Sequence, residues 1–325
     1  MYKSKLSIRQ TQSAIQDLKS FFQEELKKEL NLTRATAPLF VSQKSGLNDG
    51  LSGEKPVKFF PKDTAEELEI VHSLAKWKRQ ALYNYHFDVY EGLYTDMNAI
   101  RREERLDDTH SYYVDQWDWE KIILPKDRNI DYLKSIVNSI NKCIVDTKKH
   151  INQKYNLEHR FSEEVYFISA QELEDLYPHL TPEQRENELA SVKGTIFIYQ
   201  IGWNLKSGKP HSNRAFDYDD WYLNGDLIVY APWKNKAIEI SSMGIRVDKK
   251  SLIEQSGLST EEVKKISEFH SGIIDDILPL TIGGGIGQSR LSMVMLEKQH
   301  IGEVQSSYWP KDIKDELEKQ NIYLL

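Results

Sequence analysis

The spacing of apolar residues along the chain changes repeatedly between the periods of a helix and of a strand. Helical spacing predicts a long amphipathic helix over Ile8–Leu32. Further helices are predicted for the segments His72–Tyr85, Asp131–Tyr155, Ala170–Tyr177, Thr181–Val192, Ser251–Ser271 and Lys311–Gln320. Extended or alternating runs predict strands in the segments Ala37–Val41, Tyr112–Glu120, Gly194–Trp203, Leu227–Tyr230 and Ala237–Val247.

A glycine-rich stretch, Pro279–Leu296, stands out from this pattern. It reads PLTIGGGIGQSRLSMVML, and we predict a tight turn at its glycines that leads into an apolar helix. Glycine lets the backbone approach a ligand closely, and the free N–H groups at a helix start favour an anion. Dinucleotide-binding spacing would need glycine at Gln288, and no P-loop Gly-Lys-Ser/Thr follows. A strand-to-helix turn without a ligand is an equally good interpretation of the glycines alone.

The composition restricts the class of protein. With 325 residues and a mass of 38.0 kDa, the chain can form one large domain or two small ones. Its 29% charged and 11% aromatic residues are typical of a soluble globular protein. The net charge of −7 argues weakly against nonspecific nucleic-acid binding. We expect no membrane span, because no apolar run approaches about 20 residues, and no signal peptide, because Met1–Asp17 lacks an apolar core.

The lone cysteine, Cys143, cannot form an intramolecular disulfide, which favours a reducing, cytoplasmic location. Because it lies in the predicted helix Asp131–Tyr155, a packing role is favoured over a nucleophilic one.

Two clusters of charged residues have a simple structural interpretation. In the acidic segment HSNRAFDYDDW, solvent exposure is favoured for Asp217 and Asp220, whereas exposure and cation binding are equally open for Asp219. In the predicted helix His72–Tyr85, a solvated basic face would account for the three cations Lys76, Lys78 and Arg79.

The chain nevertheless resembles the class II aminoacyl-tRNA synthetases in three regions. Residues 279–296 contain the motif 3 spacing G-x-G-x-G-x-x-R, carried by Gly283, Gly285, Gly287 and Arg290. Residues 98–120 are similar to motif 2, with the R-x-E of Arg101 to Glu103 and with His110 at a position of Arg or His. Residues 8–42, a helix followed by a strand, are similar to the motif 1 region.

A polar row follows the motif 2 arginine. Alternation along the predicted strand places Gln116, Asp118 and Glu120 on one face. Such a row is normally the solvent face, but after this motif a substrate-lining face is favoured. Two positions depart from the motif: Tyr113 replaces an acid and Val114 replaces the usual phenylalanine.

Two acids are candidates for a metal site. Asp226 begins one predicted strand and Glu239 lies in the next, and an acid on each of two antiparallel strands can chelate Mg²⁺. A pair of unrelated surface acids is the alternative. The aspartyl-tRNA synthetases carry a similar pattern, which implies an ATP–Mg²⁺ site here. The same similarity implies that Lys78 and Arg246 bind a substrate carboxylate.

Collinear segments over nearly the whole chain resemble one family, the ammonia-dependent aspartate–ammonia ligases. They are HSLAKWKRQ, GLYTDM, VDQWDWE, DYDDW, LNGD, EISSMGIRVD and TIGGGIGQSR. The resemblance implies an α+β fold, a class II synthetase-like core with a mainly antiparallel sheet flanked by helices. It implies a single catalytic domain over residues 1–325 and a homodimer. The implied reaction joins L-aspartate and ammonia at the expense of ATP through a β-aspartyl-adenylate, releasing AMP and pyrophosphate. The connection between DYDDW and LNGD is shorter than in some members.

This resemblance implies a role for each candidate residue. L-aspartate would contact Ser73, Lys78, Gln116, Asp118 and Arg246. ATP would contact Arg101, Glu103, His110, Asp226, Glu239, Gly285, Gly287 and Arg290, with Mg²⁺ held by Asp226 and Glu239. Because asparagine synthesis activates the β-carboxylate, we expect Lys78 and Arg246 to hold the α-carboxylate instead. Arg101 would stabilise the transition state, and Asp49 in the loop Ser45–Glu54, with Asp219 behind it, would attract and deprotonate ammonium.

Three other functions fit the sequence less well. An aspartyl-tRNA synthetase ordinarily has an anticodon-binding domain, for which we expect no residues to remain. A glutamine-dependent asparagine synthetase starts its mature chain with a nucleophilic cysteine, whereas position 2 is Tyr2. A non-catalytic regulatory subunit would be expected to have lost the charged ATP-binding residues, and these are present here. We therefore predict an enzyme that acts without nucleic acid or membrane.

Overall fold

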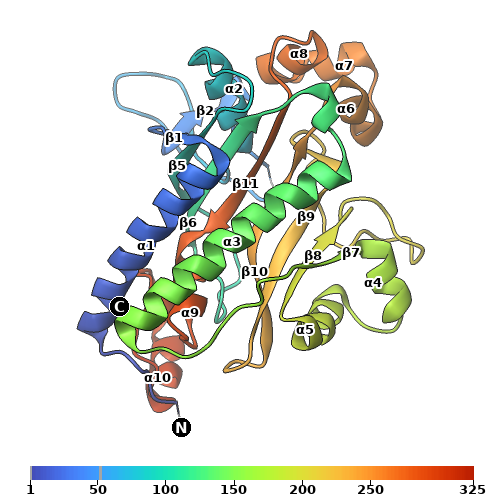
Figure 1. Ribbon diagram of the computed structural model, residues 1–325. Coiled ribbons are helices and arrows are strands. Elements are labelled where there is room, and N and C mark those ends of the chain that lie inside the picture. The colour runs from blue at the N-terminus through green and yellow to red at the C-terminus, as the bar shows by residue number, and fades with distance from the viewer. Residues whose placement is uncertain (1, 51–52) are drawn as a thin grey trace.

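A mixed eight-stranded sheet forms the centre of the protein (Figure 1). The computed structural model describes residues 2–50 and 53–325. The sheet order is β1 (Leu32–Arg34), β5 (Gly92–Ile100), β6 (Tyr113–Ile122), β11 (Thr281–Gly287), β10 (Lys236–Arg246), β9 (Asp219–Ala231), β8 (Thr195–Tyr199), β7 (Tyr166–Ser169). Only the edge pairs β1–β5 and β7–β8 are parallel. The central strands are antiparallel, which confirms the predicted character of the sheet.

A small antiparallel sheet and a set of helices surround this centre. The small sheet has the order β2 (Phe40–Ser42), β4 (Leu68–Ile70), β3 (Lys58–Phe59). The helices are α1 (Ile8–Leu30), α2 (Ala75–Asn84), α3 (Ile130–Tyr155), α4 (Ala170–Leu176), α5 (Pro182–Lys193), α6 (Lys249–Ser256), α7 (Thr260–Lys264), α8 (Glu268–Ile274), α9 (Gln288–Met295) and α10 (Lys311–Lys319). Short 3₁₀ turns occupy Gln43–Ser45, Pro125–Asp127 and Ile301–Glu303. No helix among the described residues is long and apolar enough to span a bilayer.

Helices α1 and α3 lie side by side across one face of the large sheet (Figure 1). Helix α1 begins with a capping box, in which the Ser7 side chain accepts from the Gln10 N–H and Gln10 accepts from the Ser7 N–H. It ends at Asn31, whose φ of 57° stops the helix in the left-handed conformation. The strand β1 follows at once, so the end of α1 leads directly into the edge of the sheet.

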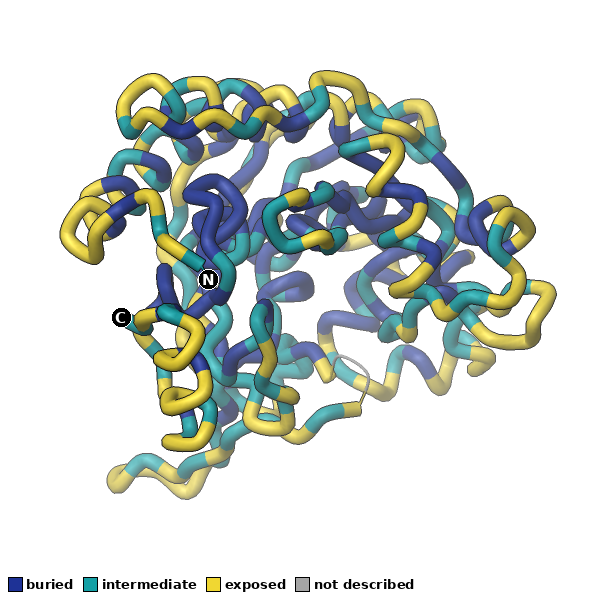
Figure 2. The backbone as a smooth tube through the Cα atoms, turned by 90° about the horizontal axis from the view of Figure 1, so that it is seen from below, coloured by how far each residue is buried: buried dark blue, intermediate teal, exposed yellow. Residues whose placement is uncertain are grey.

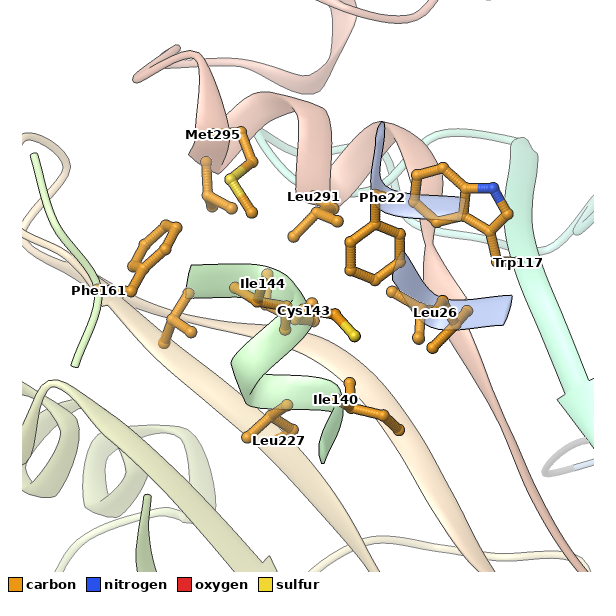
Figure 3. Packing of buried hydrophobic residues seen from close by; sticks show 14 of the residues in the cluster. Phe22, Leu26, Trp117, Ile140, Cys143, Ile144, Phe161, Leu227, Leu291 and Met295 are labelled. Carbon is orange, nitrogen blue, oxygen red and sulfur yellow. The ribbon is translucent and has the colours of Figure 1, made fainter. Parts of the chain in front are cut away.

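The main core lies between these helices and the sheet (Figure 3). Phe22 of α1 packs against Trp117 of β6, with ring centroids 4.7 Å apart. Cys143 of α3 is buried in the same core, as predicted, and burial raises the pKa of its thiol to about 12. Burying a large apolar side chain contributes about 1.5–3 kcal/mol, so this layer fixes the position of β6. Figure 2 shows the buried backbone enclosed by exposed loops and helix surfaces.

Strand β6 has two chemically different faces. Trp117 and Trp119 are fully buried and belong to the core under α1 and α3. Because side chains alternate along a strand, the residues between them point to the opposite face. Gln116 and Asp118 line a cavity there and Glu120 is fully buried, so the predicted polar row does not face bulk solvent.

Several predicted elements differ from the structure. The segment 251–271 forms parts of three short helices instead of one helical run, because Gly257 ends α6 with a φ of 66°. The predicted loop His211–Trp221 already contains the start of β9 at Asp219. Strands β1, β3, β4 and β7 and the longer strand β5 were not predicted. The predicted glycine turn is a regular strand, β11, and α9 begins only at Gln288.

Candidate active site

A cavity of 290 Å³ opens on the face of the sheet opposite α1 and α3. Its walls come from β6, β9, β10 and β11, from the starts of α2 and α9, and from the segments that connect these elements. Most of the residues that the sequence predicts for the site line it, namely Asp49, Ser73, Arg101, His110, Gln116, Asp118, Asp219, Glu239, Arg246, Gly285, Gly287 and Arg290. Segments far apart in sequence therefore meet in one place, as the predicted site requires.

The glycines of β11 provide space on this face. None of the β11 glycines has a positive φ, so a left-handed turn is not the reason for their presence. A Cβ on Gly285 would collide with the side-chain oxygen of Gln116, and a Cβ on Gly283 would collide with Glu120. The glycines thus allow polar side chains of β6 to lie flat against β11, and Gly285 and Gly287 expose backbone to the cavity.

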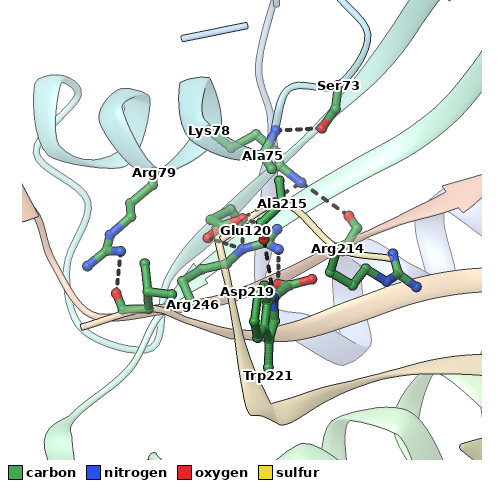
Figure 4. Close-up of polar contacts among 12 residues, drawn as sticks. Ser73, Ala75, Lys78, Arg79, Glu120, Arg214, Ala215, Asp219, Trp221 and Arg246 are labelled. Atoms are coloured by element: carbon green, nitrogen blue, oxygen red, sulfur yellow. Dashed lines mark hydrogen bonds and ion pairs between the residues drawn. The ribbon is translucent and has the colours of Figure 1, made fainter. Parts of the chain in front are cut away.

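A buried charge cluster forms the floor beside the cavity (Figure 4). Lys78 of α2 forms an ion pair with Asp118 and donates to the carbonyl oxygens of Trp119 at 2.8 Å and Gly284 at 3.2 Å. Its side chain is fully buried, and burial lowers the pKa of Lys78 below its usual range. Glu120 Oε2 lies 3.7 Å from Lys78 Nζ, which links Lys78 to the next member of the cluster.

Arg246 of β10 completes this cluster. Its Nε donates to Glu120 Oε1 at 2.9 Å, its Nη2 donates to Glu120 Oε2 at 2.8 Å, and its Nη1 pairs with Asp219. Burial alone would raise the pKa of Glu120, but Arg246 and Lys78 outweigh it and hold this pKa below its usual range. Burial raises the pKa of Asp219, although Arg246 and Arg214 oppose the shift. The cluster therefore orients Arg246 with one edge near the cavity.

Three buried polar atoms in the cavity wall have no partner within the described structure, namely Asp118 Oδ2, Arg101 Nε and Arg214 Nε. Asp118 Oδ2 has no donor although Asp118 is only 3% exposed, and Arg101 Nε has no acceptor. An unsatisfied buried group costs about 1–3 kcal/mol, and such groups often mark a ligand's place. Asp118 can accept from a substrate ammonium, and Arg101 can donate to an anion.

The acids proposed for Mg²⁺ lie on neighbouring strands. A β-bulge between Glu239 and Ser241 adds a residue to β10, so that Glu239 reaches the same cavity as Arg246. Asp226 Oδ1 pairs with Arg214 Nη2 at 2.5 Å. Burial, reinforced by the nearby charge of Glu239, raises the pKa of Asp226 to about 6. Arg290 Nη1 donates to the Glu239 carbonyl oxygen at 3.0 Å.

Three predicted site residues occupy other positions. Lys78 lies behind the cavity wall, Asp226 lies behind Arg214, and neither side chain lines the cavity as described. Glu103 is exposed and accepts from the backbone N–H of Lys55, while its neighbour Glu104 lines the cavity. His110 does line it and forms a hydrogen bond with Asp107, 2.9 Å from Nδ1 to Oδ1. The assigned roles of these residues stay predictions.

The solvent-exposed interpretation, which was favoured for Asp217 and Asp220 and open for the basic cluster of α2, was wrong. Asp220 is buried and accepts from Arg128 Nη2 at 2.8 Å. Asp217 is buried between Lys76 and His270. Arg79 is also buried, donating to the carbonyl oxygens of Pro279 at 2.8 Å and Val247 at 2.7 Å. These groups are internal ion pairs and hydrogen bonds and do not form solvated faces.

Sequence reasoning missed some cavity residues. Tyr218 and Arg214 lie in the acidic segment that was noted only for its aspartates. Gln305 follows α9 and donates to Ser289 Oγ at 3.0 Å, closing another side of the cavity. No spacing rule identifies Gln305, because its position depends on the return of the chain after α9.

Comparison with known proteins identifies the family. A family model described as aspartate-ammonia ligase matches residues 9–321. Curated aspartate–ammonia ligases of Bacillus thuringiensis (strain Al Hakam) and Bacillus cereus (strain AH187) are each 54% identical over 326 residues, covering 100% of both chains. The chain belongs to the aspartate–ammonia ligase family. The ligase of Bacillus anthracis (strain CDC 684 / NRRL 3495) has the same 54% identity and complete coverage.

Solved structures confirm the predicted fold of this ligase family member. An asparaginyl-tRNA synthetase of Entamoeba histolytica in complex with asparaginyl-adenylate matches with a TM-score of 0.65 and 14% identity. The match covers 92% of this chain and 68% of that chain. An aspartyl-tRNA synthetase from the same organism matches with a TM-score of 0.59 and 15% identity, covering 91% and 57%. The fold is that of a class II synthetase-like core.

Proposed function

We propose that the protein synthesises L-asparagine from L-aspartate, ammonia and ATP, through a β-aspartyl-adenylate. The proposal rests on one observation: a single cavity is lined both by arginines that can bind phosphate and by residues that can bind an amino acid. The chain that forms this cavity matches the ligases over its full length. Arginines suited to phosphate, Arg101 and Arg290, share this cavity with Arg246 and the buried acid Asp118. A site with phosphate-binding arginines next to an arginine and an acid for the substrate can bind a triphosphate beside an amino acid.

The aspartate is expected to bind with its α-ammonium and α-carboxylate toward the buried charge cluster of β6 and β10. The unpartnered Asp118 Oδ2 would accept from the α-ammonium, with Gln116 next to it on the same face of β6. Arg246 would meet the α-carboxylate, and Lys78 would support this arrangement through Asp118. Ser73 lines the same wall. The β-carboxylate would then face the phosphates, as asparagine synthesis requires.

Adenylation needs charge stabilisation more than acid–base chemistry. A β-carboxylate oxygen attacks the α-phosphorus while the bond to pyrophosphate breaks, and negative charge develops on the phosphate oxygens. Arg101, which lines the cavity with an unpartnered buried Nε, would stabilise that charge. Arg290 would hold the terminal phosphates near the start of α9, and His110 and Gly287 line the same cavity. Glu103 stays a candidate that would have to turn inward.

The residues fit a magnesium ion carried with ATP. Burial is the main cause of the raised pKa of Asp226, and the charge of Glu239 adds to it against the opposing charge of Arg214, so a cation near the two acids would relieve their repulsion. Mg²⁺ in nucleotide sites commonly uses one or two carboxylates plus phosphate oxygens, and no larger ligand cluster occurs among the described residues. When bound, Mg²⁺ would neutralise part of the negative charge on the phosphates.

The second step needs neutral ammonia beside the adenylate. Ammonia attacks the β-carbonyl carbon, the bond to the AMP oxygen breaks, and the proton lost from ammonium must reach a base. Asp49 is 2% exposed and lines the cavity, which makes it the candidate acceptor. Asp219, whose pKa is raised by burial, is the second candidate.

We also propose a cytoplasmic homodimer built from single catalytic domains. The long helix α1 followed by the edge strand β1 supports the dimer, because the family resemblance assigns that region to the interface. The lone buried cysteine supports the reducing compartment.

The test measures AMP, pyrophosphate and asparagine with L-aspartate, ATP and Mg²⁺, with and without ammonium, in the absence of tRNA. Ammonium-dependent AMP release with an equal amount of asparagine is expected. Aspartate-dependent pyrophosphate exchange without asparagine, together with charging of added tRNA, would contradict the proposal. Asp49→Asn is expected to accumulate adenylate, and asparagine release from preformed adenylate at the wild-type rate would exclude Asp49.

A further inference from the structure

A chain of four polar side chains runs behind the cavity. Ser267 Oγ lies 2.7 Å from His270 Nδ1, and His270 Nε2 lies 2.9 Å from Asp217 Oδ2. The same carboxylate oxygen pairs with Lys76 Nζ at 2.5 Å. Asp217 is 5% exposed, Lys76 6% and His270 1%. None of these side chains lines the cavity as described, so any effect on the reaction must be indirect.

The ionised carboxylate of Asp217 sets the hydrogen-bond direction between Asp217 and His270. Burial alone would raise the pKa of Asp217, but the hydrogen bond from His270 and the charge of Lys76 hold it below its usual range. An ionised carboxylate only accepts, so His270 Nε2 carries a hydrogen and donates to Asp217. With a neutral ring, Nδ1 is then the acceptor for the Ser267 hydroxyl.

One end of the network supports the loop that carries Asp49. Gly46 has a φ of 67°, and a Cβ there would come within 2.5 Å of Ser267 Oγ, so the loop rests directly on Ser267. The next residue, Leu47, packs on the apolar cluster that contains Phe269. Asp49 follows two residues later with its side chain in the cavity wall. The position of Asp49 therefore depends on the contact between Gly46 and the Ser267 side chain.

The other end supports two further walls of the cavity. Lys76 lies in the first turn of α2, next to Ala75, which lines the cavity. Asp217 directly precedes Tyr218 and Asp219, which both line it. Asp217 accepts from both Lys76 and His270, so it connects these walls to the support of the Asp49 loop.

We propose that Ser267, His270, Asp217 and Lys76 form a positioning network that fixes Asp49 relative to Asp219 and so sets the affinity for ammonium. The inference rests on the proposed function, in which these two acids receive ammonium. Groups that act together must be held within a fraction of an ångström, and residues behind them provide that precision. Aspartate and ATP make most of their contacts on the sheet, so loosening the network should affect the ammonia step most.

The experiment compares His270→Leu with His270→Gln. A glutamine amide can donate to Asp217 and accept from Ser267, whereas leucine can do neither. His270→Leu is expected to raise KM for ammonium about tenfold, with kcat at saturating ammonium and aspartate-dependent pyrophosphate exchange changed less than about twofold. His270→Gln should stay within about threefold of wild type. Ser267→Ala, a milder change, should raise KM for ammonium in the same direction.

A matched control replaces a histidine outside the network. His159 packs against Trp233 with ring centroids 4.9 Å apart, and His159→Leu should leave KM for ammonium unchanged. An unchanged KM for ammonium in His270→Leu would overturn the inference. An equal loss of pyrophosphate exchange and asparagine formation in that variant would also overturn it, because it would indicate general loss of structure.

A second readout does not depend on activity. Amide hydrogen exchange in residues 43–50 and 211–220 is expected to be faster in His270→Leu than in wild type and His159→Leu. Equal exchange in these segments would overturn the network. If wild type made no asparagine while this exchange difference was present, the proposed function would fail and the structural coupling would stand.

Discussion

Gly283 and Arg246 lie so close that a Cβ on Gly283 would come within 2.6 Å of the guanidinium Nη2. The same Nη2 donates to Glu120 Oε2 at 2.8 Å. Because β11 has ordinary extended geometry, glycine is required here for space and not for an unusual φ. The glycine-rich stretch thus determines where the buried arginine of β10 can lie.

Gly283→Ala is therefore expected to displace Arg246 from Glu120. Overpacking and disturbance of a buried ion pair should destabilise the protein by about 1–3 kcal/mol. We expect kcat/KM for aspartate to fall about 100-fold, because a misplacement of about 1 Å is enough for such a loss. Steady-state kinetics and denaturant unfolding measure both effects. Gly50→Ala is the control, since no atom of the described residues beyond its chain neighbours lies within 4 Å of its Cβ position; equal losses in the two variants would contradict the explanation.

Lys78→Met should leave Asp118 and Glu120 as poorly compensated buried acids. Removing one partner of a buried pair typically costs about 3–5 kcal/mol. Adding Asp118→Asn should recover part of that stability, because it removes one of the carboxylates that Lys78 compensates. Aspartate binding should not recover, since the ammonium acceptor is lost as well. Thermal unfolding and aspartate titration distinguish the effects, and recovery of binding in the double variant would refute the role of Asp118.

The sequence predicts many of the residues that line the cavity, although it misses several strands. The row on β6 follows from simple alternation and was correct, because a regular strand separates Trp117 and Trp119 from Gln116 and Asp118. Recognition of short collinear segments identified most of the cavity wall without any knowledge of how the strands pair.

Glu239 shows the limit of pattern reasoning. Glu239 and Arg246 are seven positions apart, and strict alternation would place them on opposite faces. The bulge between Glu239 and Ser241 brings both to the cavity. The burial of Asp217 and Asp220 could not be predicted from the sequence either, because their partners His270 and Arg128 are distant in sequence. Local patterns do not contain such tertiary contacts.

Glu239→Gln is expected to weaken magnesium binding in the presence of ATP. The Mg²⁺ concentration for half-maximal pyrophosphate exchange should rise about tenfold, equivalent to about 1.4 kcal/mol. Removing the neighbouring charge should also lower the pKa of Asp226 from about 6. Carboxyl-resolved NMR titration of Asp226 checks this without activity. An unchanged Asp226 titration together with an unchanged Mg²⁺ requirement would contradict the pairing of the two acids.

His300 should make the protein less stable in mild acid. Its Nδ1 accepts from the Gly302 N–H at 3.0 Å, and burial together with Lys234 lowers the pKa of His300 to about 4. Between that value and about 6.5, the unfolded chain binds a proton that the folded protein excludes. The free energy of unfolding should therefore fall with decreasing pH by up to about 1.4 kcal/mol per pH unit from this residue.

His300→Asn isolates this contribution. Asparagine can still accept from the Gly302 N–H at the start of the 3₁₀ turn, but it does not titrate. Urea unfolding from pH 7 to 4 should give a shallower decline for the variant, so the difference between the two proteins changes with pH. His159, whose pKa is also lowered to about 4, is present in both and cancels from this comparison. Parallel curves for wild type and variant would show that His300 is protonated equally in the folded and unfolded states.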